Sequence, residues 1–132
     1  MDSTDVISMT GLNAAQTQLQ VSASNVANMD DSAPLPGSGV TGPAPYVPTR
    51  VETVSLGSGG VQAQLSASQP ASVAAYEPDS PYADHQGMVA KPNVDPVAEM
   101  VGRMQAVEQY KASVAVLEAN NHMHKSALNL LG

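Results

Sequence analysis

The chain has 132 residues and a formal net charge of −7, and it contains no cysteine, tryptophan or phenylalanine. Its acidity argues against nucleic acid as a partner, because phosphate binding requires clustered Lys and Arg. The absence of cysteine excludes disulfides, thiol catalysis and cysteine-ligated metals. Only 13% of the residues are charged, about half of the usual share. We therefore expect other protein chains to cover much of the surface.

Residues 1–29 are predicted to form an N-terminal helix. Large apolar residues recur there every seven positions. A second series, which includes small residues, occurs three positions later in the sequence. The two series are Leu12, Leu19 and Val26, then Ala15, Ser22 and Met29. The segment 1–10 carries acidic residues and no basic one, so we expect no cleaved signal peptide of the type that begins with positive charge.

The middle of the chain changes character twice. Residues 30–45 are rich in proline and glycine, which predicts an extended linker. Residues 46–92 predict a small β and loop region, in which two alternating runs flank a glycine-rich turn and form a hairpin. The expected strands are 47–56, 61–65, 71–76 and 87–90, with the turn at 57–60.

Residues 93–132 are predicted to form a C-terminal helix with a long stripe at steps of three and four. The stripe consists of Met100, Met104, Val107, Tyr110, Val114, Leu117, Asn121, His124, Leu128 and Leu131. The simplest partner for it is the N-terminal helix, packed as an antiparallel coiled coil. The expected fold class is therefore α+β, mainly α, with a small β-hairpin and loop insertion. Polar Asn121 and His124 either fix the register or mark a solvated end of the stripe.

Candidate chemistry is weak throughout the sequence. His122 and His124 lie two positions apart, which places them on different sides of a helix and disfavours a shared metal ion. Asp79 and Asp84 flank a turn, where capping explains them better than acid–base catalysis. His85 has no nucleophile or paired acid at a recognisable spacing.

The glycines at 57, 59 and 60 lack the Lys-Ser or Lys-Thr that ends a phosphate-binding loop. No apolar run approaches the roughly 18 residues needed to span a bilayer, which argues against direct membrane insertion. We expect no enzyme activity, no cofactor and no metal.

Three stretches resemble bacterial flagellar axial proteins. Residues 76–95, which include Pro92-Asn93-Val94-Asp95, are followed by Glu99-Met100 and are similar to the proximal rod members of that family. Residues 11–15 and 22–28 resemble the N-terminal helix signature of the wider rod, hook and filament-junction group. After residue 28 the chain departs from the family pattern, since Met29-Asp30-Asp31 replaces the usual Thr-Pro-Gly-Tyr-like turn.

The resemblance implies a non-catalytic structural subunit of the flagellar rod, the drive shaft for motility. Such subunits are exported by the flagellar type III apparatus and assemble in the periplasm-spanning part of the basal body. Partners would be the protein itself and other rod proteins, with the MS ring, the export gate and the distal rod as further candidates. The alternatives are another axial paralogue or a non-catalytic helical binding module of the export system.

The terminal helices would form the core of the rod. The predicted subunit-interface and coiled-coil residues are Leu12, Ala15, Leu19, Val26, Met100, Met104, Val107, Tyr110, Val114, Leu117, Leu128 and Leu131.

Overall fold

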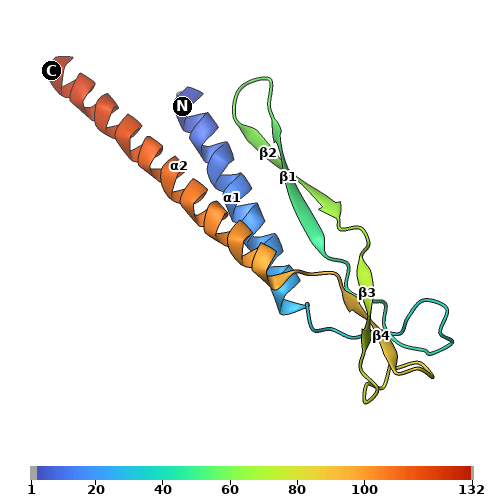
Figure 1. The fold of residues 1–132 in the computed structure, drawn as a ribbon. Helices are drawn as coiled ribbons and strands as arrows, with labels where there is room; N and C mark the ends of the chain where they lie inside the picture. The colour runs from blue at the N-terminus through green and yellow to red at the C-terminus, as the bar shows by residue number, and fades with distance from the viewer. Residues whose placement is uncertain (1–2, 132) are drawn as a thin grey trace. The chain divides into compact units, whose positions relative to one another are not determined.

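A computed structural model describes residues 3–131, with side chains described from residue 3 to residue 130. Two helices enclose four strands in chain order (Figure 1). The strands form two two-stranded sheets, β1 with β2 and β3 with β4. This confirms the α+β class with two terminal helices and a small β insertion. The elements are α1 (Ser3–Ala27), β1 (Thr49–Ser55), β2 (Val61–Ala67), β3 (Ser72–Tyr76), β4 (Met88–Pro92) and α2 (Pro96–Leu131).

The chain divides into two compact units, which are described separately. Unit 1 contains residues 1–20, 51–64 and 101–132, and unit 2 contains residues 21–50 and 65–100. The helices α1 and α2 and the strands β1 and β2 each include residues of both units. Neither helix of the described chain is long and apolar enough to cross a membrane.

Local signals explain where the helices begin and end. Asp95 caps α2, because its Oδ1 accepts hydrogen bonds from the backbone N–H of Val97 at 2.9 Å and of Ala98 at 3.3 Å. Pro96 occupies the first helical position, where a missing N–H costs nothing. At the end of α1, the carbonyl of Ser24 accepts two hydrogen bonds from Asn28, from its side chain at 2.7 Å and from its backbone N–H at 3.2 Å.

In unit 1, α1 and α2 lie side by side. A hydrogen bond of 2.8 Å runs from Nδ2 of Asn120 to Oδ1 of Asp5. The approach points along the pair are Asp5 with Asn120, Gly11 with Ser113, and Gln18 with Gly102. Residue numbers rise along one helix and fall along the other, so the chain directions are opposite. The expected coiled coil on the large apolar stripe is not confirmed by these contacts.

In unit 2, the core lies around β4. Strands β3 and β4 are antiparallel, with Ala74 opposite Ala90 and Tyr76 opposite Met88. Ala33 exchanges both backbone hydrogen bonds with Ala90, at 2.8 and 3.0 Å, so part of the predicted linker lies against this strand. Val89 and Ala90 are fully buried as a result. Backbone pairing on both sides of β4 explains why the unit needs few large side chains.

Candidate assembly interface

The seam between α1 and α2 in unit 1 consists of small and polar residues. Ala15 is 1% exposed and Ala106 is 3% exposed, although neither side chain has more than a methyl group. A Cβ atom added to Gly11 would lie 2.9 Å from Oγ of Ser113, which leaves no room for one. Small side chains allow two helix backbones to approach closely. Close approach, rather than large interdigitating side chains, therefore joins the helices here.

The seam has a seven-residue period on each helix. On α1 in unit 1, the buried residues Ser8 and Ala15 are seven positions apart, and Ala14 is buried beside them. On α2 the corresponding series is Ala106, half-buried Ser113, and Asn120. Sequence analysis identified Ala15 and Ser22 as a small-residue series, but it did not identify the series on α2. The signal that could have identified it is the seven-residue spacing of small and polar residues, which runs alongside the large apolar stripe.

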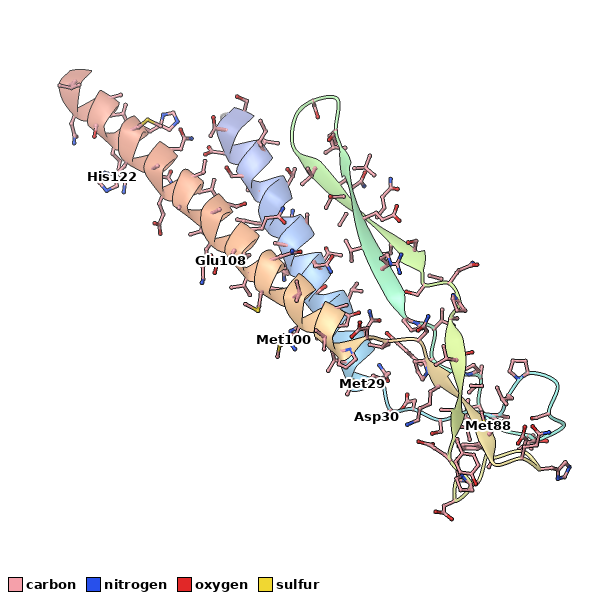
Figure 2. The ribbon with its side chains drawn as sticks, in the orientation of Figure 1. Met29, Asp30, Met88, Met100, Glu108 and His122 are labelled. Atoms are coloured by element: carbon pink, nitrogen blue, oxygen red, sulfur yellow. The ribbon has the colours of Figure 1, made fainter. Side chains whose placement is uncertain are left out.

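Two large residues of the α2 stripe, Met104 and Val107, point away from the seam. At about 100° of rotation per residue, Met104 lies about 160° and Val107 about 100° around the helix from Ala106. Exposure agrees with this rotation for Met104, which is 63% exposed, and for Val107, which is 39% exposed. Tyr110 lies only about 40° around the helix from Ala106 and is nevertheless 43% exposed. We call these three residues the α2 ridge. Figure 2 shows labelled Glu108, from the same turns of the helix, directed away from α1.

The other predicted interface residues fall into three groups. Ala15 is buried, and Leu12, Leu19, Val26, Val114 and Leu117 are half-buried. Met100 and Leu128 are exposed, at 64% and 69%. The side chain of Leu131 lies outside the described part of the chain. Asn121 and His124 are both exposed, as is His122, which Figure 2 labels near the end of α2.

The turn between β1 and β2 is held against the first turns of α1 in unit 1. The hydroxyl of Thr10 accepts a hydrogen bond from the N–H of Val61 at 3.2 Å and donates one to the carbonyl of Ile7 at 2.7 Å. Gly60 has a φ of 88° and lies so close to Thr10 that a side chain would collide with it. A groove of about 410 Å³ opens beside this contact. Its lining includes Ile7, Gly11, Val61, Ala112 and Val116.

Unit 2 is organised by polar side chains instead. Asn25 is 2% exposed and joins α1 to the first residue of β1 and to the first turn of α2. Its amide donates to the carbonyl of Thr49 at 2.8 Å and to the carboxylate of Glu99 at 2.7 Å. Its carbonyl accepts from the N–H of Thr49 and from the hydroxyl of Tyr46, both at 3.1 Å. These partners were not identified from the sequence.

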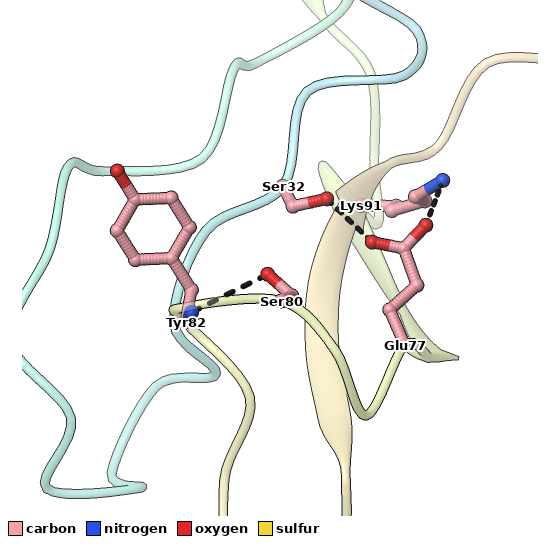
Figure 3. A network of polar contacts seen from close by, with 5 residues as sticks. All are labelled: Ser32, Glu77, Ser80, Tyr82 and Lys91. Atoms are coloured by element: carbon pink, nitrogen blue, oxygen red, sulfur yellow. Dashed lines mark hydrogen bonds and ion pairs between the residues drawn. The ribbon is translucent and has the colours of Figure 1, made fainter.

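A second polar network holds the predicted linker to the β3–β4 hairpin (Figure 3). The carboxylate of Glu77 forms an ion pair with Lys91 of β4 and accepts a hydrogen bond from the hydroxyl of Ser32 at 2.7 Å. The hydrogen bond from Lys91, followed by that from Ser32, lowers the pKa of Glu77 below its usual value. The same contact raises the pKa of Lys91. Both shifts favour the charged pair.

The turn before β4 depends on Asp84. One carboxylate oxygen accepts hydrogen bonds from the N–H of Met88 at 2.9 Å and of Gln86 at 2.7 Å. These two backbone donors, with Met88 first, lower the pKa of the Asp84 carboxyl. The interpretation of Asp84 as a turn-capping residue is thus confirmed. Gly87 completes the turn with a φ of 76°, and a side chain there would strike the ring of Tyr76.

Within residues 3–130, no three side chains of His, Cys, Asp or Glu lie together in a way that could hold a metal ion. Every buried side-chain nitrogen and oxygen in the described part of the chain has a hydrogen-bond partner. The arrangement offers close helix packing, polar ties and an exposed apolar ridge. These features can hold protein surfaces against one another.

Comparison with known proteins agrees with this geometry. The family model described as "Flagella basal body rod protein" matches residues 7–30, and "Flagellar basal body rod FlgEFG protein C-terminal" matches residues 85–130. The first match covers most of α1, and the second covers β4 and α2. The two regions matched are therefore the chain segments that build the α1–α2 seam.

Curated relatives match along almost the whole chain. A flagellar basal-body rod protein FlgC of Escherichia coli O6:H1 is 38% identical, over 94% of this chain and 92% of its own length. The FlgC protein of Salmonella typhimurium is 37% identical over the same shares, and that of Bacillus subtilis is 31% identical over 94% and 93%. Identity at this level over nearly full length in distant bacteria establishes the family. The chain belongs to the FlgC family of flagellar basal-body rod proteins.

Proposed function

We propose that this chain, a structural subunit of the flagellar rod, polymerises through α1 and α2 and thereby contributes to the drive shaft for motility. Its relatives are named as basal-body rod proteins. Its partners are further copies of itself and other rod proteins, with the MS ring, the export gate and the distal rod as additional candidates. It acts without catalysis, in the part of the rod that spans the periplasm.

The α2 ridge is the observation that supports this proposal most directly. Met104, Val107 and Tyr110 expose apolar surface along one side of a helix. Contiguous exposed apolar surface marks contact with another protein, because covering it releases roughly 25 cal/mol per Å². The chain as a whole carries few charged residues, at 13%. We therefore assign the ridge to a contact between subunits.

The predicted segments take corresponding places in the proposal. Residues 1–29 and 93–132 form the core of the rod as an antiparallel helix pair. Its inner contact uses the small residues around Ala15, while its outer contacts use the α2 ridge. Residues 30–45 serve as the connection to the β region at 46–92. The scarcity of charge supports an outer face that neighbouring subunits cover.

A pair of adjacent substitutions tests the proposal. Met104→Asp places a carboxylate on the α2 ridge, whereas Gln105→Asp places the same group on the next exposed position of the helix. Because Met104 is 63% exposed, its replacement leaves the subunit itself intact. We expect cells with Met104→Asp to synthesise normal amounts of the chain but not to swim, and cells with Gln105→Asp to swim.

The readouts are swimming in soft agar and the amount of this chain in isolated basal bodies. Normal swimming and normal incorporation of Met104→Asp would show that the ridge is not an assembly surface. Loss of both with the control substitution as well would show that the helix tolerates no added charge there, and the assignment to the ridge would then fail.

A further inference from the structure

Asn25 is a buried polar residue near the end of α1, and its amide is fully used. Two N–H donors meet two oxygen acceptors, on Thr49 and Glu99, while its carbonyl meets two donors, on Thr49 and Tyr46. The orientation of the amide is fixed, since the reverse orientation would place its NH₂ group against the N–H of Thr49. Burial of an amide is costly unless it is satisfied in this way.

Neither aspartate nor alanine meets these demands. Aspartate has the same shape but no donor, so it cannot bond the carbonyl of Thr49, and it would face the carboxylate of Glu99. Alanine would leave the backbone of Thr49 without its side-chain partner. The neighbouring Ser22 is also fully buried, and its hydroxyl lies 3.3 Å from the backbone carbonyl of Glu99. Both residues therefore face inward.

We propose that Asn25 is a positioning residue of the subunit. Its amide holds the approach to β1 and the first turn of α2 against the end of α1, and it acts inside the subunit rather than at a boundary between subunits. This follows from the burial of Ser22 and Asn25 and from the saturation of the Asn25 amide, which leave neither side chain available to a neighbour. The inference goes beyond the proposed assembly role and assigns a task to the 22–28 stretch.

Exchanging the amide and the carboxylate between positions 25 and 99 tests the hydrogen bond between them. In Asn25→Asp, two carboxylates face each other at the 2.7 Å contact with Glu99, and we expect the contact to open. Adding Glu99→Gln supplies an amide that can donate to Asp at position 25, which restores this bond with reversed polarity. Glu99→Gln alone keeps an acceptor for Asn25. Asn13→Asp, at an exposed position of the same helix, is the matched control.

The direct readout is hydrogen exchange of the Thr49 amide in the purified full-length chain, because this N–H donates to Asn25. We expect exchange about tenfold faster in Asn25→Asp, the cost of leaving buried polar groups without partners. In the double variant we expect at least half of that change, on a logarithmic scale, to be reversed. Glu99→Gln and Asn13→Asp should match the wild type. Unchanged exchange in Asn25→Asp, or no reversal by Glu99→Gln, would overturn the proposal.

Swimming of the same strains separates this inference from the proposed function. If Asn25 positions the helices of a rod subunit, swimming is lost in Asn25→Asp and recovers when Glu99→Gln is added within the same chain. If exchange follows the expected order while every strain swims normally, the tie stands and the proposed assembly role falls. Recovery of swimming only through changes in another rod protein would instead place Asn25 at a subunit boundary and contradict the inference.

Discussion

Different kinds of contact stabilise the interior of each of the two units. In unit 1, Ala15 and Ala106 bring two helix backbones together, and the large side chains of the α2 ridge remain outside. In unit 2, Asn25 and Glu77 each join separate segments through polar contacts, and Asp84 caps the turn before β4. Close packing of small residues leaves apolar surface for other chains, whereas saturated polar side chains specify one internal arrangement. The first unit is suited to assembly, and the second to fixing the subunit's own geometry.

The largest effect is expected from enlarging the seam of unit 1. Ala106→Leu places a large side chain where only 3% of the residue is exposed, so the two helices must separate. Overpacking of this kind costs about 1–3 kcal/mol. Ala115→Leu, at an exposed position of α2, should cost little. The urea midpoint of helix unfolding, followed by circular dichroism, measures the difference, and equal midpoints for the two variants would remove the seam from the account.

A smaller effect is expected from acid on unit 2. The pKa of Asp84 is lowered from 3.8 by the N–H groups of Met88 and Gln86, and that of Glu77 is lowered from 4.5 by Lys91 and Ser32. A carboxyl group whose pKa is lower in the folded chain stabilises that chain above its unfolded pKa. This stabilisation is lost as the pH falls through the lower, folded value. Unit 2 should therefore weaken as the pH drops below about 4.5.

The basic partner has the opposite sign. The hydrogen bond to Glu77 raises the pKa of Lys91 above 10.5, so its contribution is present below that pH and is lost as the pH rises through the folded value. Unit 2 should thus be most stable between these two limits. The urea midpoint of the Val89 amide signal, followed by NMR across the pH range, provides the measurement. Asp84→Asn should reduce the loss in acid, because asparagine retains an acceptor but does not titrate. Asp79→Asn, at an exposed position, should leave the acid loss unchanged.

The smallest effect is expected from a surface ion pair in unit 1. Lys111 and Glu108 lie 2.8 Å apart, but their side chains are 65% and 72% exposed. Exposed pairs of this kind contribute about 0.5 kcal/mol or less. Glu108→Gln should therefore leave both the urea midpoint and swimming at wild-type levels. A loss of swimming in this variant would extend the assembly surface from the α2 ridge to this ion pair, whose residues lie beside Met104 and Val107 on the helix.

Regular periodicity made much of the fold predictable. The stripe from Met100 onward predicted α2, the glycine-rich stretch at 57–60 predicted the turn between β1 and β2, and the residues around Asp84 predicted a capped turn. Each of these signals is local, because the residues that cause the structure are neighbours in the chain. Local signals also placed β3 and β4 close to their observed positions.

The internal contacts were harder to predict. A hydrophobic pattern gives most weight to large side chains, so the seven-residue spacing of Ala106, Ser113 and Asn120 contributes little to it. The partners of Asn25 lie 21 to 74 residues away in sequence, and no local pattern connects them. Long-range polar ties depend on how the backbone folds back on itself, which one sequence does not display.

The most direct test of the central claim uses the absence of cysteine from the chain. Met104→Cys creates a single thiol on the α2 ridge, at a position that is 63% exposed. We predict that a maleimide labels this thiol rapidly in the purified chain and at least tenfold more slowly in isolated basal bodies, where a neighbouring subunit covers it. Equal labelling rates in the free chain and in the assembled rod would contradict the account.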